Sequence, residues 1–167
     1  RKPPQKSSGV FKQSSLSGVP VPVLTVAIRR TLDLFGTESR FEQMAEPILK
    51  WVGGKRQLLS DLRSRFPIKY DQYHEPFIGG GAVFFELEPT TGSINDLNRR
   101  LITFYKIIRD HPDQLIKENQ RHSYDEDYYY DARDRFNKLH TLDERSVKQE
   151  IEEASLMLYL NRTGYNG

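Results

Sequence analysis

The residues best suited to chemistry lie in the segment Tyr73 to Leu87, Y-H-E-P-F-I-G-G-G-A-V-F-F-E-L. The segment is typical of a strand that ends in three glycines and turns directly into a helix. Because glycine has no Cβ, the chain at Gly79, Gly80 and Gly81 can adopt positive φ and let a ligand approach the backbone, while the new helix offers unpaired N–H groups. The segment predicts a turn that holds a nucleotide-like ligand, although a tight connection with no ligand would have the same composition.

The glycine spacing favours an adenosyl ligand over a dinucleotide. Phe84 stands where the G-x-G-x-x-G fingerprint has its third glycine, and a bulky residue there argues against close helix packing under a pyrophosphate. An adenosyl ligand without phosphates needs the close backbone approach but no phosphate cradle. We therefore expect a ligand of that kind.

A carboxylate supplies the second point of contact. Asp96 follows the apolar run Gly92 to Asn95, which predicts a second strand. In an open α/β sheet, an acidic group at this place can accept hydrogen bonds from both hydroxyls of a ribose. Asp96 could instead cap a helix that begins at Leu97, or do both, and Asn95 could serve as the cap.

A run rich in lysine and glycine, K-W-V-G-G-K-R at Lys50 to Arg56, precedes the first strand. It is not a P-loop, because Leu49 stands where the first glycine should be and Arg56 replaces the Ser or Thr that binds magnesium. Lys55 could pair with a carboxylate, and Trp51 could pack over an aliphatic or cationic part of the ligand, a sulfonium included. Alternatively, Trp51 is a core aromatic and Lys55 a solvated surface charge.

The last residues of the chain suit contact with DNA. The run Asn161 to Gly167, N-R-T-G-Y-N-G, combines an Arg that can contact bases, a Tyr that can stack and an amide that can read a base edge. A polar helix end with turn residues would look the same. We interpret the acidic and aromatic stretch Tyr124 to Arg135 as a solvated helix face, because consecutive carboxylates point in different directions around a helix.

Composition narrows the class of protein. With 167 residues, 37% of them hydrophobic and 29% charged, the chain is expected to be a soluble globular protein. It has no cysteine, which excludes disulfides and thiolate metal sites and agrees with the cytoplasm as its compartment. Because its histidines show no metal-ligand spacing, we expect no metal. The longest apolar run, Val19 to Ile28, is too short to span a bilayer. A net charge of +2 gives no global basic field, so a nucleic-acid partner must be argued from local features.

The elements that position these residues follow from hydrophobic spacing. Residues 1–45 show no sustained period and are expected to be a flexible extension of unknown role, with at most one short helix at about 32–43 and the natural start near Met44. Residues 46–111 predict the α/β part that binds the cofactor. Its expected elements are a helix at Leu58 to Phe66, a strand at Tyr70 to Phe77, a helix at Ala82 to Leu87, a strand at Gly92 to Asn95 and a helix from Leu97 that Pro112 ends.

Residues 112–167 are polar and helical in pattern. Helices are expected at about Pro112 to Arg121, Asp125 to Leu139 and Glu144 to Arg162. The last helix is expected to end at Gly164, since glycine suits the left-handed position beyond a helix. This helical segment precedes the residues that suit DNA contact.

Four blocks in order closely resemble the N-terminal half of Dam-type DNA adenine methyltransferases: K-W-V-G-G-K-R-Q-L-L, E-P-F-I-G-G-G-A-V-F-F, I-N-D-L-N-R-R-L-I and L-Y-L-N-R-T-G-Y-N-G. The resemblance covers roughly Pro47 to Gly167. It implies a partial S-adenosylmethionine-dependent methyltransferase fold, α/β and Rossmann-like, whose helical segment leads into a DNA-recognition region. It also implies methyl transfer from S-adenosylmethionine to N6 of an adenine flipped out of double-stranded DNA, in a short site such as GATC.

The resemblance also implies roles for individual residues. At the methionine end of the cofactor it places Trp51, Gly53 and Lys55; along the cofactor it places Phe77, Gly79 and Gly81; and on the ribose hydroxyls it places Asp96. Lys50 corresponds to a position that can touch the target DNA. Arg162, Tyr165 and Asn166 match the start of the recognition region, where an aromatic wedges into the duplex and a neighbouring amide meets the orphaned base.

One family motif, the catalytic D-P-P-Y tetrad, appears nowhere in this chain. In the family it lies downstream of the helical region, where its Asp and a backbone carbonyl accept the hydrogens of the poorly nucleophilic N6 and an aromatic stacks on the flipped base. We therefore expect a chain cut short, the cofactor-binding half of a methyltransferase, monomeric, with no catalytic residue of its own and inactive alone. The alternatives are a methyltransferase for RNA or a small molecule, and a non-catalytic DNA-binding remnant; mismatch-repair marking and restriction-modification are both open as biological settings.

Overall fold

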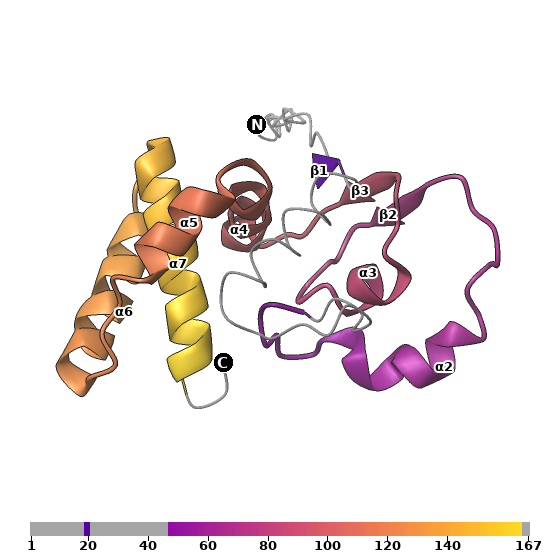
Figure 1. Cartoon of the computed structure of the whole chain (residues 1–167), viewed down its shortest axis with the longest axis horizontal. Coiled ribbons are helices and arrows are strands. Elements are labelled where there is room, and N and C mark those ends of the chain that lie inside the picture. Colours follow the sequence, from indigo (N-terminus) through magenta and orange to yellow (C-terminus); the bar gives the residue numbers. More distant parts are fainter. Residues whose placement is uncertain (1–18, 21–46, 165–167) are drawn as a thin grey trace, which may run out of the picture.

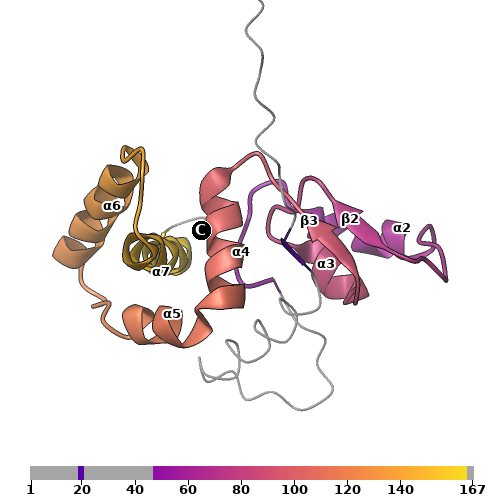
Figure 2. The same ribbon diagram turned by 90° about the horizontal axis from the view of Figure 1, so that it is seen from above.

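The computed structural model describes residues 19–20 and 47–164 (Figure 1). A small sheet with short helices forms one part, and the longer helices form the other. In both Figure 1 and Figure 2, helix α4 (Arg99–Asp110) lies between the sheet and helix α7 (Val147–Thr163). The expected helix at about 32–43, Met44, and the DNA-contacting candidates Tyr165 and Asn166 lie outside the described residues.

The sheet has three short strands in the order β1-β3-β2. Strand β2 (Tyr73–Glu75) runs parallel to β3 (Gly92–Ile94), and β1 (Val19–Pro20) pairs with β3 in the antiparallel direction. Helix α3 (Ala82–Leu87) connects the two parallel strands. The α/β organisation expected from the sequence is thus confirmed in outline, as a helix-rich chain around a small sheet that contains a parallel pair.

The first strand is shorter than the expected Tyr70 to Phe77. It ends at Glu75 because Pro76 has no N–H to donate to the ladder. The expected helix at Leu58 to Phe66 is a 3₁₀ turn, η1 (Lys55–Leu58), followed by α2 (Leu59–Arg63). This helix stops before Phe66 because a residue that precedes proline, here Pro67, disfavours the helical conformation.

Helix α4 begins two residues later than expected. Asn98 caps it, with its side-chain oxygen accepting from the N–H groups of Arg100 at 3.0 Å and Leu101 at 3.3 Å. Leu97, the expected first residue of this helix, lies outside it and is 92% exposed. Pro112 does follow the end of α4, and it is also the first residue of α5 (Pro112–Asn119), a position where its missing N–H costs nothing.

The remaining helices lie close to their expected ranges. Helix α6 spans Glu126–His140, and α7 begins after a capping box formed by Ser146 and Gln149. Gly164 ends α7 in an extended conformation, with φ −69° and ψ 150°, so the expected left-handed cap is wrong. None of the helices within residues 47–164 is both long and apolar enough to cross a membrane.

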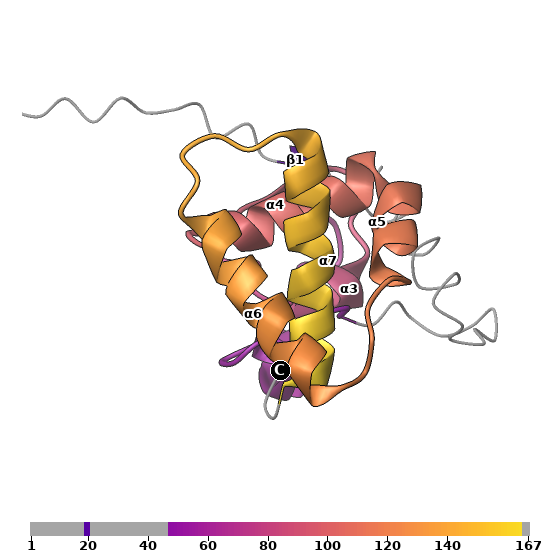
Figure 3. The same ribbon diagram turned by 90° about the vertical axis from the view of Figure 1, so that its left-hand side faces the viewer.

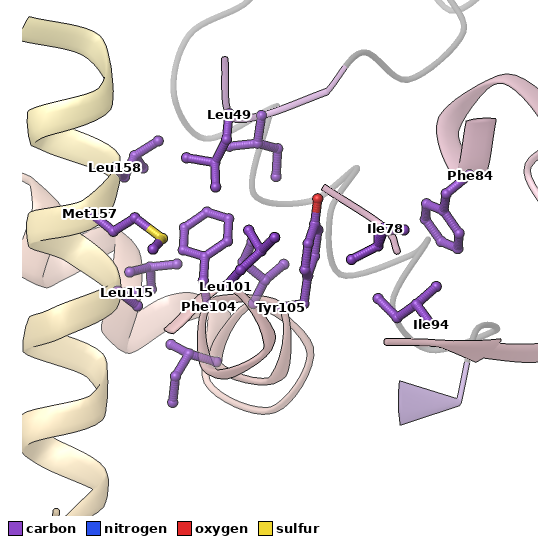
Figure 4. Close-up of a cluster of buried hydrophobic side chains, with 14 of the residues drawn as sticks. Leu49, Ile78, Phe84, Ile94, Leu101, Phe104, Tyr105, Leu115, Met157 and Leu158 are labelled. Carbon is purple, nitrogen blue, oxygen red and sulfur yellow. The ribbon is translucent and has the colours of Figure 1, made fainter. Parts of the chain in front are cut away.

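One hydrophobic core joins the two parts through α4. Leu101, Phe104 and Ile108 of this helix are completely buried. Figure 4 shows Phe104 on the side of Met157 and Leu158 of α7, and Tyr105 on the side of Ile78 next to the sheet. Helix α7 in turn lies against α4, α5 and α6 (Figure 3), which explains why it is buried around most of its circumference from Glu153 to Tyr159.

Candidate ligand-binding site at the glycine turn

The glycine turn has the backbone conformation that its composition predicts. Gly79 and Gly81 have φ of 52° and 80°, in the left-handed region that favours glycine. A Cβ at Gly81 would lie 2.8 Å from the ring of Phe85, and a Cβ at Gly80 would lie 3.0 Å from the carbonyl oxygen of Leu49. Side chains are therefore excluded from this turn both by conformation and by space.

Asp96 holds the turn from the end of β3. Its Oδ2 accepts from the N–H of Gly79 at 3.0 Å, and its Oδ1 accepts from the N–H of Asn98 at 2.9 Å. The helix cap that Asp96 or Asn95 could have provided comes from Asn98 instead. A carboxylate has about four acceptor positions, so half-buried Asp96 keeps lone pairs for further donors such as hydroxyls.

Tyr105 holds the same glycine from the other side. Its buried hydroxyl donates to the carbonyl of Gly79 at 3.0 Å. Burial, followed by the negative charges of Glu75 and Asp96, raises the pKa of Tyr105, so the hydroxyl stays protonated and remains a donor. The sequence placed Tyr105 in the helix from Leu97 and assigned it no separate role. The available signal was its residue type, because the hydroxyl of a buried Tyr usually finds a hydrogen-bond partner.

Lys55 ties the upstream run to the end of β2. Its ammonium lies 2.8 Å from Glu75 Oε1 and also donates to the carbonyl of Phe77. Tyr73 donates its hydroxyl to the other oxygen of Glu75, and burial together with this hydrogen bond raises the pKa of Tyr73. The pairing of Lys55 with a carboxylate is thus present, but the partner is Glu75, a 7% exposed residue to which the sequence assigned no role.

Trp51 lies against the glycine turn. A Cβ at Gly79 would be 3.2 Å from Trp51 Cδ1, and one at Gly80 would be 3.1 Å from Trp51 Cβ. The indole is partly buried on the edge of the core. Gly53 has φ of 73°, and a Cβ there would meet no described residue within 4 Å. Phe77, two residues beyond β2, is mostly exposed. Trp51 and Asp96 therefore lie directly against the glycine turn, and Lys55 lies against Phe77 just before it.

Two of the candidates for DNA contact, Lys50 and Arg162, lie at the end of α7. Arg162 is exposed in its last turn, and Lys50 is joined to that turn through Asn161 by two hydrogen bonds. The sequence assigned Asn161 no separate role, because its partner is distant in the chain. Within residues 47–164 there is also no cluster of His, Asp and Glu able to hold a metal ion.

Parallel strands joined through a glycine turn, with a carboxylate at the end of the second strand, are typical of α/β proteins that bind nucleotide-type ligands at the carboxyl ends of their strands. Residues 51–167 match the family described as D12 class N6 adenine-specific DNA methyltransferase, and the chain belongs to this family. The family expected from the four sequence blocks is thereby confirmed.

Relatives with assigned names support the same family. The chain is 42% identical over 125 residues to the Type II methyltransferase M1.LlaDCHI of Lactococcus lactis subsp. cremoris, covering 72% of this chain and 42% of that protein. It is 36% identical over 140 residues to the Type II methyltransferase M.MjaIII of Methanocaldococcus jannaschii, covering 73% and 47%. It is 36% identical over 123 residues to the DNA adenine methylase of Escherichia coli K12, covering 71% and 41%. The chain spans less than half the length of these relatives.

Proposed function

We propose that this chain forms the S-adenosylmethionine-binding part of a Rossmann-like methyltransferase that modifies N6 of adenine in double-stranded DNA. Family membership and the names of the relatives support the reaction. The observation that carries the donor site is the position of Asp96, whose carboxylate orders Gly79 and retains acceptor positions beside the turn. An adenosyl ribose offers two neighbouring hydroxyl donors to such a carboxylate.

The donor extends from Asp96 across the glycine turn in this proposal. Gly79 and Gly81 allow the adenosyl group to approach the backbone, with Phe77 along the cofactor. At the methionine end lie Trp51, Gly53 and Lys55. The indole face can attract the sulfonium, and the ammonium of Lys55 has three donors, of which Glu75 and the Phe77 carbonyl use two. The third is available to the carboxylate of the methionine moiety.

Methyl transfer needs groups beyond the donor site. The lone pair of adenine N6 is delocalised into the ring, so acceptors for its hydrogens and a stacking surface for the flipped base are required. The D-P-P-Y tetrad that serves in the family does not occur among residues 1–167. We therefore propose that the chain by itself binds the donor without transferring the methyl group.

Donor binding is tested by calorimetry with S-adenosylmethionine. We expect saturable binding by the chain and a loss of at least about tenfold in affinity for Asp96→Ala, since the ribose then loses hydrogen bonds to a charged acceptor. Asp61→Ala, which removes an exposed carboxylate from α2, is the matched control and should bind like the unaltered chain. Absence of saturable binding by the unaltered chain would overturn the donor site.

Methyl transfer is tested with labelled donor and an adenine-containing duplex. We expect no incorporation with this chain and incorporation with a version extended through a D-P-P-Y segment. The acceptor is tested separately by replacing both Tyr165 and Asn166 with Ala, which should weaken duplex binding and leave calorimetric donor binding unchanged. Equal duplex binding by this variant would favour RNA or a small molecule as the acceptor.

A further inference from the structure

The carboxamide of Asn161 holds the peptide groups of Lys50. Its Oδ1 accepts from the N–H of Lys50 at 2.8 Å, and its Nδ2 donates to the carbonyl of Lys50 at 2.7 Å. The two residues are 111 positions apart, and Asn161 is 9% exposed. One side chain thus satisfies both main-chain groups of Lys50, as a neighbouring strand would.

This pairing needs the chemistry of asparagine. Only a carboxamide presents a donor and an acceptor side by side at neutral pH. A carboxylate would accept from the Lys50 N–H but would face the Lys50 carbonyl with a second acceptor, and a glutamine would add a methylene at a buried place. The arrangement is therefore sensitive to changes that hardly alter volume.

The residues on each side of this pairing belong to the two proposed sites. Next to Lys50, the side chain of Trp51 lies against Gly79, and the Leu49 carbonyl lies under Gly80. Next to Asn161, Arg162 lies in the last turn of α7, and Tyr165 and Asn166 follow in sequence. The pairing therefore links the wall of the donor site to the helix that precedes the proposed DNA-contacting residues.

We propose that Asn161 is a positioning residue, which fixes Lys50 and Trp51 on the last turn of α7 so that the donor site and the DNA-contacting residues keep one register. This inference rests on the proposed function, because it assigns Asn161 to the positioning of that same site. In this role the side chain of Asn161 touches neither the donor nor a base, and it acts through the backbone of Lys50.

The test compares Asn161→Ala and Asn161→Asp over a range of pH. Trp51 is the only tryptophan, so its fluorescence reports both the loop and donor binding. We expect Asn161→Ala to bind S-adenosylmethionine at least about tenfold more weakly than the unaltered chain at every pH, because both main-chain groups of Lys50 lose their side-chain partner. Asn161→Asp should be equally weak at pH 8. It should recover toward unaltered affinity at pH 5, because burial and the facing Lys50 carbonyl raise the pKa of this carboxyl, and a protonated carboxyl has both a donor and an acceptor.

The matched controls are Asn119→Ala and Asn119→Asp at the last position of α5, where the carboxamide oxygen has no hydrogen-bond partner among the described residues. Neither control should alter donor affinity or its pH dependence. Acrylamide quenching of Trp51 without donor gives a second readout. Quenching should increase in Asn161→Ala at every pH, and in Asn161→Asp at pH 8 but not at pH 5. Unaltered quenching and affinity in Asn161→Ala, or no recovery of Asn161→Asp at pH 5, would overturn the inference.

The two proposals fail in different ways. If the unaltered chain shows no response to S-adenosylmethionine, the proposed function is wrong, and the quenching of Trp51 still decides whether Asn161 positions the loop. If the unaltered chain binds the donor and the variants bind equally well, the function stands and the positioning role is wrong.

Discussion

At the scale of single residues, Gly79 is held in place by contacts from three other residues. Its N–H donates to Asp96 and its carbonyl accepts from Tyr105, while the indole of Trp51 covers its Cα. A loop that is already in its binding conformation loses less conformational entropy on binding. At the proposed donor site, we therefore expect the side chains around Gly79 to support donor affinity even where they do not touch the donor.

Tyr105→Phe removes one of these supports without changing the shape of the core. The Gly79 carbonyl would lose its buried partner, which we expect to lower the free energy of unfolding by about 1–3 kcal/mol and to weaken donor binding. Urea unfolding and calorimetry measure the two effects. Tyr124→Phe, at a mostly exposed ring, is the control and should change neither; unaltered donor affinity in Tyr105→Phe would show that the hydroxyl does not order the turn.

Gly81→Ala and Gly53→Ala form a matched pair, since both glycines have a similar positive φ, 80° and 73°. The left-handed conformation costs a residue with a Cβ about 1–2 kcal/mol at each position. At Gly81 the Cβ would also meet the ring of Phe85 at 2.8 Å, whereas at Gly53 it would meet no atom of residues 47–164 within 4 Å. We expect the larger loss of stability for Gly81→Ala in urea unfolding; equal losses would contradict the contact with Phe85.

At the scale of elements, a buried charge cluster joins the helices. Glu153 of α7 is 1% exposed and forms ion pairs with Arg100 of α4, whose Nε lies at 3.0 Å, and with Arg145, which precedes α7. The guanidinium of Arg100 also donates to the carbonyl of Phe136 in α6 at 2.7 Å and stacks over its ring. Three helices therefore meet at this cluster, and their relative positions depend on its charges.

Glu153→Gln is expected to destabilise the chain strongly. Removing the single negative charge leaves two arginines without a counter-charge at a buried place, which costs about 3–5 kcal/mol. Glu152→Gln is the control on the same helix: its bidentate pair with Arg135, at 2.6 and 2.7 Å, is more exposed and should contribute no more than about 1 kcal/mol. Urea unfolding separates the two, and similar losses would show that burial does not decide the effect.

At the scale of the whole molecule, the free energy of unfolding should depend on whether His122 is protonated. This residue follows α5, and its ring accepts or donates hydrogen bonds with the hydroxyls of Tyr128 at 2.7 Å and Ser155 at 2.8 Å. Its ring centre lies 4.7 Å from that of Tyr159. Burial lowers the pKa of His122 below its ordinary value of 6.5, against smaller opposing effects of Ser155 and Glu118.

The sign of the pH dependence follows from that direction. Above pH 6.5 the histidine is neutral in both states and adds no pH dependence; below it the unfolded chain takes up the proton first, so the folded state loses stability as pH falls toward the lowered pKa. Unfolding in urea at several pH values should therefore show less acid loss in His122→Gln than in the unaltered chain. His140→Gln, at an exposed histidine that ends α6, is the control and should leave the contribution of His122 in place. If His122→Gln does not change how the free energy of unfolding varies with pH, the lowered pKa of His122 is contradicted.

Much of the fold could be predicted because it is encoded locally. Helix α3 has the expected bounds, and the three later helices lie close to theirs, since apolar spacing and caps act over a few residues. The errors lie where neighbours compete. Asn98 takes the cap that was expected nearer to Asp96, which leaves Leu97 outside the helix, and Gly164 is extended although glycine permits the left-handed form.

The sequence by itself determined the family and the glycine turn with its following carboxylate, because these are patterns of residue type over short stretches. Only the tertiary structure decided that Tyr105 and Asp96 hold opposite ends of one glycine, and that Asn161 binds the backbone of Lys50. These contacts join residues 17, 26 and 111 positions apart, and they exist only once α4 and α7 have packed against the sheet and the upstream run. Local sequence preferences do not predict these contacts, because they form only when the whole core packs.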